Sequence, residues 1–122
     1  MIASHSVAIL VATGLYTAVA VLQLFAPRTS LAVIFGIQTD DRFTLLLARH
    51  WGLLAALVGG LLVYAAFHPE VRAPVVVVAI VEKLTLAGLV FFASWKRTPT
   101  ATRTAVVDVA IAVLLLLLLL ST

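Results

Sequence analysis

The sequence predicts an all-α fold, a four-transmembrane-helix up-down-up-down bundle with a short interfacial helix in loop one. The first observation is composition, because 64% of the 122 residues are hydrophobic and only 11% are charged, whereas soluble domains are about a quarter charged. The second is that four apolar runs, each of ~20 residues, are long enough to cross a bilayer. These runs use nearly the whole chain, which is therefore a single integral membrane domain, residues 1–122. We expect the spans at about 6–26, 43–67, 74–95 and 101–120.

The first apolar run, residues 6–26, ends immediately before Pro27. Its residues 18–20, Ala-Val-Ala, resemble a signal-peptidase site, so a cleaved signal peptide is the alternative interpretation. No Lys or Arg precedes the run, however, and a basic start is characteristic of signal peptides. We therefore expect a spanning helix, on which Tyr16 and Gln23 share one face.

The connection after the first span contains a short apolar stretch, residues 31–37, that is too short to cross a bilayer. Thr29 or Ser30 is placed to cap its start, and Gly36 is placed to end it. We expect a short helix that lies at the membrane interface. A partly re-entrant turn is the alternative.

The second span follows residues 39–41, Thr-Asp-Asp, which supply an N-cap and negative charge at a helix start. Within the span, Gly52, Ala56 and Gly60 recur at a spacing of four residues. Such a ridge of small residues lets another helix backbone approach closely in a membrane. The ridge therefore predicts close helix packing and favours a homo-oligomer.

The third span carries the adjacent charges Glu82 and Lys83 near its midpoint. An ionisable group at that depth costs roughly 2.5–3.5 kcal/mol on insertion scales and usually turns toward protein or water. Ala79 and Ala87 flank Lys83 on its own face, which again favours close packing. The fourth span contains one interior charge, Asp108, and ends in a tract of seven leucines that we expect to face lipid.

Basic residues are distributed unevenly between the two sides of the spans. Loops one and three contain five Lys and Arg residues, whereas the other side contains Arg72 alone. By the positive-inside rule, we expect loops one and three to be cytoplasmic and both termini to lie outside, in a cell inner membrane. This imbalance argues against a dual-topology transporter, and basic residues that flank spans do not form a nucleic-acid patch. The five are Arg28, Arg42, Lys96, Arg97 and Arg103.

Depth decides which polar residues of different spans can meet: we expect Glu82 and Lys83 about two turns deeper than Arg49 and Asp108, from where the long side chain of Lys83 can still reach outward. Neighbours on a helix point about 100° apart, so Glu82 and Lys83 each need a partner on another helix. Arg49 and Asp108 enter from the same side, which allows an ion pair between them. One hypothesis is a ligand-binding pocket between the helices; the alternative is a set of structural ion pairs. The predicted pocket residues are Tyr16, Gln23, Arg49, His50, Glu82, Lys83, Thr85 and Asp108.

The residue types point to binding more than to catalysis. The chain has no cysteine, which excludes thiolate sites, and it has no phosphate loop, Ser-His-Asp spacing or zinc signature. Haem ligation by His5 and His68 rests on spacing alone, and Glu82 disfavours a neutral, nucleophilic Lys83. We expect no metal and no cofactor, and we assign no catalytic residue.

The expected function is non-enzymatic: the pocket binds a lipophilic ligand with a polar head, or the protein acts as a membrane scaffold. Membrane lipids or a lipophilic small molecule are the expected partners. Two alternatives stay open. One is a small proton-coupled transporter with Glu82 or Asp108 as the proton carrier. The other is a membrane enzyme that acts on a lipid or isoprenoid substrate, with one of these carboxyl groups as general acid.

Two motifs carry a resemblance to known small membrane proteins. The run Ala-Arg-His-Trp-Gly-Leu-Leu at 48–54, followed by residues 64–69, resembles the small four-span scaffold protein of ergosterol biosynthesis. In that family an Ala-Arg pair and a glycine open the second span. The connection from Pro27 to residues 35–37, Phe-Gly-Ile, is similar to DoxX-like bacterial families of small four-span proteins. The resemblance, over about residues 10–95, implies a bundle that binds or organises other membrane components without chemistry of its own.

Overall fold

The computed structural model describes residues 3–92 and 98–121, and within these ranges it contains helices and no strand. Four helical segments are long and apolar enough to cross a membrane: 6–25, 42–66, 69–92 and 99–120. The predicted all-α, multi-pass membrane bundle is confirmed. The elements are η1 (Ala3–His5), α1 (Ser6–Ala18), η2 (Val19–Val21), α2 (Leu22–Phe25), α3 (Pro27–Phe35), α4 (Arg42–Ala66), η3 (Pro69–Val71), α5 (Arg72–Phe92) and α6 (Pro99–Leu120).

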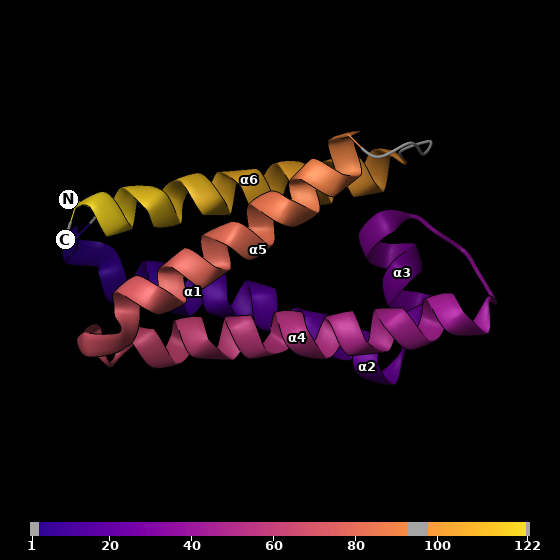
Figure 1. Cartoon of the computed structure of the whole chain (residues 1–122), viewed down its shortest axis with the longest axis horizontal. Helices are drawn as coiled ribbons and strands as arrows, with labels where there is room; N and C mark the ends of the chain where they lie inside the picture. Colours follow the sequence, from indigo (N-terminus) through magenta and orange to yellow (C-terminus); the bar gives the residue numbers. More distant parts are fainter. Residues whose placement is uncertain (1–2, 93–97, 122) are drawn as a thin grey trace.

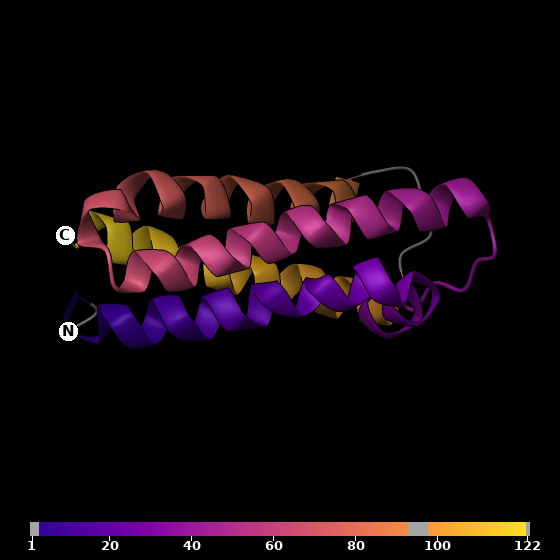
Figure 2. The ribbon, with the colours of Figure 1, turned by 90° about the horizontal axis from the view of Figure 1, so that it is seen from below.

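The bundle consists of two antiparallel helix pairs (Figures 1 and 2). α1 packs mainly on α4, and α5 packs mainly on α6. Figure 1 shows that α5 begins beside α4, near the end of the bundle that holds both termini, and finishes beside α6 at the opposite end. At that opposite end, α3 lies between α4 and α6 and contacts both. The two pairs therefore meet at the terminal end and are held apart by α3 at the other.

Glycines bring α1 and α4 into backbone contact. A Cβ on Gly59 would lie 2.5 Å from both the Ala18 nitrogen and the Gly14 carbonyl oxygen, and a Cβ on Gly52 would lie 2.7 Å from the Ala20 carbonyl oxygen. Real Cβ atoms do not approach so closely, so these positions accept no side chain without separating the helices. The glycines therefore let the two helices of the first pair approach to backbone contact.

The predicted Gly52–Ala56–Gly60 ridge is wrong in part. Gly52 lies in the seam, but the next seam glycine is Gly59, and a Cβ on Gly60 would meet nothing within 4 Å. A helix has 3.6 residues per turn, so its buried face alternates steps of three and four residues rather than repeating every four. The buried residues of α4 follow this pattern at Ala48, Gly52, Ala55, Gly59, Leu62 and Ala66, with Ala65 beside them.

The short helix predicted in loop one is α3, and it begins earlier than expected. Pro27 occupies its first turn and no side chain caps it, because the fixed φ of proline already suits a helix start. Thr29 and Ser30 therefore do not act as its caps, whereas Gly36, with φ +67°, ends the helix as predicted. The Thr104 hydroxyl donates to the Ile34 carbonyl at 2.6 Å and fixes the end of α3 to α6.

Side chains cap the starts of α4 and α6. Asp41 Oδ2 accepts hydrogen bonds from the Thr44 hydroxyl at 2.7 Å and from the Thr44 backbone N–H at 2.9 Å, which lower the pKa of the Asp41 carboxyl below its ordinary value. Thr98 Oγ1 accepts from the Ala101 N–H at 3.0 Å and donates to the Phe35 carbonyl. Thr98 thus starts α6 and anchors the end of α3 at once.

Arg72 closes the opposite end of the molecule. Its Nε donates to the Ala65 carbonyl at 2.9 Å and its Nη2 donates to the Ala66 carbonyl at 2.7 Å, at the end of α4 where carbonyls lack helical partners. Its Nη1 donates to the Ser6 hydroxyl at 3.3 Å. One side chain therefore joins the end of α4, the start of α5 and the start of α1.

Two apolar clusters stabilise the bundle, one at each end. The terminal-end core joins α1, α4, α5 and α6, and the α3-end core joins α3, α4, α5 and α6. The leucine tract of α6 does not simply face lipid, because Leu115 and Leu118 are buried in the terminal-end core while Leu116, Leu117 and Leu120 are exposed. The terminal-end core is Leu10, Leu62, Ala66, Val76, Ala79, Leu115 and Leu118; the α3-end core is Leu31, Phe35, Ala48, Ala87, Val90, Ala101 and Ala105.

The glycine seam yields a matched pair of substitutions. Gly59→Ala places a methyl group against the α1 backbone and should destabilise the protein by about 1–3 kcal/mol, as overpacked cores do. Gly60→Ala adds the same methyl group to open space and should be neutral or stabilising by about 0.5–1 kcal/mol, since alanine favours the helix. Helix content followed by circular dichroism during denaturation in micelles measures both changes. Equal effects of the two substitutions would contradict the observed seam.

Candidate functional site

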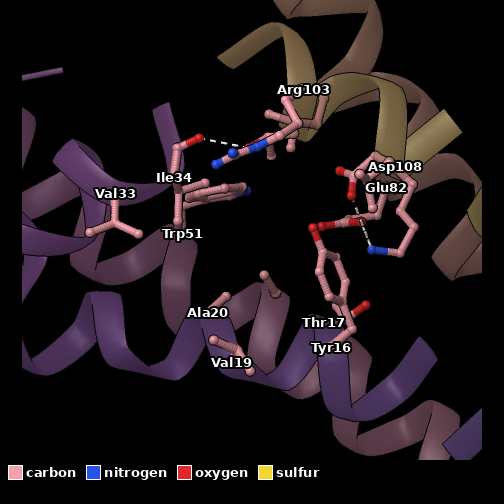
Figure 3. Close-up of a pocket in the computed structure, with 15 residues that line it drawn as sticks. Tyr16, Thr17, Val19, Ala20, Val33, Ile34, Trp51, Glu82, Arg103 and Asp108 are labelled. Carbon is pink, nitrogen blue, oxygen red and sulfur yellow. Dashed lines mark hydrogen bonds and ion pairs between the residues drawn. The ribbon is translucent and has the colours of Figure 1, made fainter. Parts of the chain in front are cut away.

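A cavity of about 420 Å³ lies between the two helix pairs (Figure 3). α1, η2, α3, α4, α5 and α6 all contribute to its wall, so the cavity exists only in the assembled bundle. Its polar lining is Tyr16, Thr17, Glu82, Lys83, Arg103, Thr104 and Asp108. Its apolar lining is Val19, Ala20, Val33, Ile34, Trp51, Ala55, Leu86 and Val107.

One cavity side chain from each of the four spans lies at about the same depth along the bundle. Tyr16, Trp51, Lys83 and Asp108 each lie about nine residues from the end of their span that is nearest α3. At a rise of 1.5 Å per residue this is ~14 Å along each helix axis. Lys83 sits one turn from Ala79 of the terminal-end core and one turn from Ala87 of the α3-end core. The charged layer therefore lies between the two apolar cores.

Lys83 is the centre of the charged layer. It is only 2% exposed, and its Nζ lies 3.5 Å from Asp108 Oδ1 and 4.0 Å from Glu82 Oε2. Its Nζ also lies 5.8 Å from the centre of the Tyr16 ring, within the range of a cation–π contact. Burial of an unpaired ammonium is very costly in free energy. The contact with Asp108 therefore offsets the cost of burying Lys83 inside the bundle.

The Glu82 carboxylate lies farther from Lys83 Nζ than the Asp108 carboxylate does. Its side chain is 20% exposed, yet Oε2 is buried and has no hydrogen-bond partner among the described residues. The 4.0 Å separation from Lys83 Nζ is an ion-pair distance and too long for a hydrogen bond. The cavity wall therefore contains a carboxylate oxygen that still lacks a donor.

Arg103 and Trp51 form the other side of the cavity. Figure 3 shows the Arg103 guanidinium pointing toward Ile34 and Trp51, away from Glu82 and Asp108. Trp51 is half-buried and packs against Phe35, with ring centres 5.6 Å apart. The cavity thus has a carboxylate-rich side and an aromatic side with one exposed cation.

The predicted pocket residues separate into two groups. Tyr16, Glu82, Lys83 and Asp108 come together at the cavity. Gln23 is fully buried but outside the lining, where its Nε2 donates to the Ala48 carbonyl at 2.8 Å. The remaining three are exposed and do not line the cavity: Arg49, His50 and Thr85.

The expected Arg49–Asp108 ion pair is not formed, because Asp108 pairs with Lys83 instead. The buried face of α4 runs through Ala48 and Gly52, which turns Arg49 outward, so α4 supplies Trp51 rather than Arg49 to the cavity. Of Glu82 and Lys83, which were each expected to need a partner on another helix, Lys83 has one in Asp108, whereas Glu82 Oε2 has no hydrogen-bond partner among the described residues. Lys83 approaches Asp108 on α6 and also the neighbouring Glu82.

Sequence reasoning did not select Arg103, Thr104, Trp51 and Thr17 for the site. Arg103 was counted with the basic residues of loop three, although it falls within the span predicted at 101–120, and α6, which begins at Pro99, includes it. The available signal was helical spacing, since Thr104 lies one turn before Asp108 and therefore on the same face. Among the described residues, no group of three His, Cys, Asp or Glu side chains is placed to hold a metal ion.

Removal of the buried cation tests the geometry of the charged layer. Lys83→Met should lower the free energy of unfolding by about 3–5 kcal/mol, because it leaves Asp108 and Glu82 buried without a counter-charge. Combining it with Glu82→Gln and Asp108→Asn should recover much of that loss. Arg49→Met should have little effect, since Arg49 is exposed. Denaturation in micelles measures each variant, and a loss for Arg49→Met equal to that for Lys83→Met would refute the observed pairing.

No protein-family model, curated protein or solved structure matches this chain. The resemblance to the DoxX-like families and to the ergosterol scaffold protein thus stays a prediction. The geometry of the cavity is the feature of this chain that bears on its function.

Proposed function

We propose that this protein is a non-enzymatic membrane protein that binds a lipophilic molecule with a polar head in the cavity between its helix pairs. One observation carries the proposal: a cavity with mostly apolar walls contains a single buried cluster of charges. A volume of about 420 Å³ is in the range of small-molecule sites, which combine apolar walls with a few placed polar groups. The cavity therefore suits an amphipathic ligand.

The exposed residues of the cavity wall indicate where such a molecule would enter. Val19 and Val33 line it and are 54% and 65% exposed, and Tyr16 is 47% exposed. These residues belong to η2, α3 and α1, on the outer side of segments that cross or flank the bilayer. An apolar molecule would thus enter sideways from the lipid and place its head at Lys83, Glu82 and Asp108.

Binding is favoured over the other candidate functions. A transporter would have to open the terminal-end core, which includes Leu10, Leu62 and Leu115 and separates the cavity from the terminal end in this conformation. For an enzyme, Asp108 is paired with Lys83, so Glu82 would have to serve as the general acid. A scaffold role would use the exposed apolar faces of the spans and is compatible with a bound ligand.

We propose that the α3 end of the protein faces the cytoplasm of a cell with an inner membrane. Arg28, Arg42 and Arg103 lie at the α3 end, and Arg72 lies at the terminal end, which supports this orientation under the positive-inside rule. Lys96 and Arg97, also used for that prediction, lie outside the described residues.

Self-association also stays a proposal. Most of the small residues that favoured it are used inside the chain: Gly52 and Gly59 contact α1, and Ala79 and Ala87 belong to the two cores. A homo-oligomer would therefore have to form through the exposed apolar faces of the spans.

Filling the cavity tests the binding proposal. Ala20 lines the cavity (Figure 3), so Ala20→Phe should displace the ligand, whereas Ala110→Phe adds the same ring to an exposed position on α6 and should not. Native mass spectrometry after mild extraction measures the retained molecules. We expect the original chain and Ala110→Phe to retain an amphipathic molecule and Ala20→Phe to lose it. Equal retention by all three proteins, or by none, would refute the proposal.

A further inference from the structure

The charges on the inner side of the cavity do not cancel among themselves, and only Arg103 on the opposite wall brings the formal charge of the whole lining to zero. On the inner side, the single cation Lys83 faces two carboxylates, with its Nζ 3.5 Å from Asp108 and 4.0 Å from Glu82. Lys83 and Asp108 are almost completely buried, with side chains 3% and 6% exposed. With all three groups ionised, the cluster carries one negative charge in excess, in surroundings where uncompensated charge is expensive.

Among the described residues, no second cation lies within ion-pair distance of Glu82 or Asp108. Glu82 Oε2 has no hydrogen-bond partner among residues 3–92 and 98–121. The other cation of the cavity wall, Arg103, is exposed and points toward Ile34 and Trp51 on the opposite side (Figure 3). A buried acceptor without a donor costs free energy, so the missing group is a donor, and preferably a cation.

The aromatic residues around the cavity favour the same kind of group. Tyr16 presents its ring to Lys83 Nζ at 5.8 Å, and Trp51 lines the cavity on the opposite side. Aromatic faces attract cations through the negative charge above and below the ring. Carboxylates combined with aromatic rings are suited to recognise an ammonium group rather than an anion.

We infer that the polar head received by this cavity is a protonated amine, which donates a hydrogen bond to Glu82 Oε2, and that the ligand class is a lipophilic amine. The inference rests on the proposed binding function and specifies its ligand. A hydroxyl head would supply the donor but leave the excess charge. An anionic head would add to that charge. The apolar part of the amine lies along Val19, Val33 and Trp51, toward the lipid.

Three probes that share one tail and differ in their head group test the ligand class: dodecylamine, dodecanol and dodecyl sulfonate. The protein is placed in phosphatidylcholine nanodiscs and carries Trp95→Phe, which leaves Trp51 as its single tryptophan. Because Trp51 lines the cavity, a saturable change of its emission reports occupation of the site. We expect dodecylamine to bind more tightly than dodecanol, and dodecyl sulfonate to bind most weakly.

A matched pair of variants assigns the preference to Glu82. Glu82→Gln keeps the shape of the side chain and removes its charge, so it should weaken dodecylamine binding by about ten- to a hundredfold, the effect of one hydrogen bond to a charged group. Glu70→Gln makes the same change at an exposed position, and it should have no effect. If Glu82→Gln fails to fold, the order of affinities of the three probes for the unsubstituted cavity still tests the assignment of the ligand as an amine.

The outcomes separate the ligand class from the binding function. If dodecanol or dodecyl sulfonate binds as tightly as dodecylamine, the amine assignment is overturned, while saturable binding at Trp51 still supports a binding protein. An effect of Glu70→Gln as large as that of Glu82→Gln overturns the assignment to Glu82. If no probe changes the Trp51 emission saturably, the ligand class and the proposed function are both overturned.

Discussion

The buried contact between Lys83 and Asp108 is the constraint on which the rest of the structure depends. An ammonium group on a membrane-spanning helix needs a counter-charge at its own depth, and Asp108 supplies one at 3.5 Å. The contact fixes α5 against α6 in rotation and in depth, because a shift of one residue would turn either group away by about 100°. It also places the charges of one helix pair opposite Tyr16 and Trp51 of the other pair.

The cavity results from a difference in packing between the α1–α4 pair and the region around α3. Gly14 and Gly59 bring α1 and α4 to backbone contact, and Gly52 lies against Ala20 and Gln23 in the segments that follow α1. α3 then lies between α4 and α6 and is anchored there by Thr98 and Thr104. At that end the pairs pack together through α3, and at the other end the terminal-end core joins them. The charged layer lies in the space between.

Much of the fold was predictable because membrane spans are determined by the length and apolarity of local sequence. The rotation of each helix was not, since it depends on contacts between distant residues. Arg49 and Lys83 both have depths that suit Asp108, and only the buried face of α4, set by Gly52 and Gly59, excludes Arg49. Of the predicted site, Tyr16, Glu82, Lys83 and Asp108 come together, but whether they bind a ligand lies beyond what helical periodicity can predict.

The most direct test of this account is a solid-state NMR measurement of the contact between Lys83 and Asp108 in lipid bilayers. Lys96→Arg leaves Lys83 as the single lysine of the chain, so ¹⁵N-lysine and ¹³C-aspartate labels report one nitrogen. The account predicts a direct dipolar coupling from Lys83 Nζ to the Asp108 carboxyl carbon, lost in Asp108→Asn prepared without labelled asparagine. A Lys83 Nζ that shows no carboxyl coupling and exchanges freely with bulk water would contradict it.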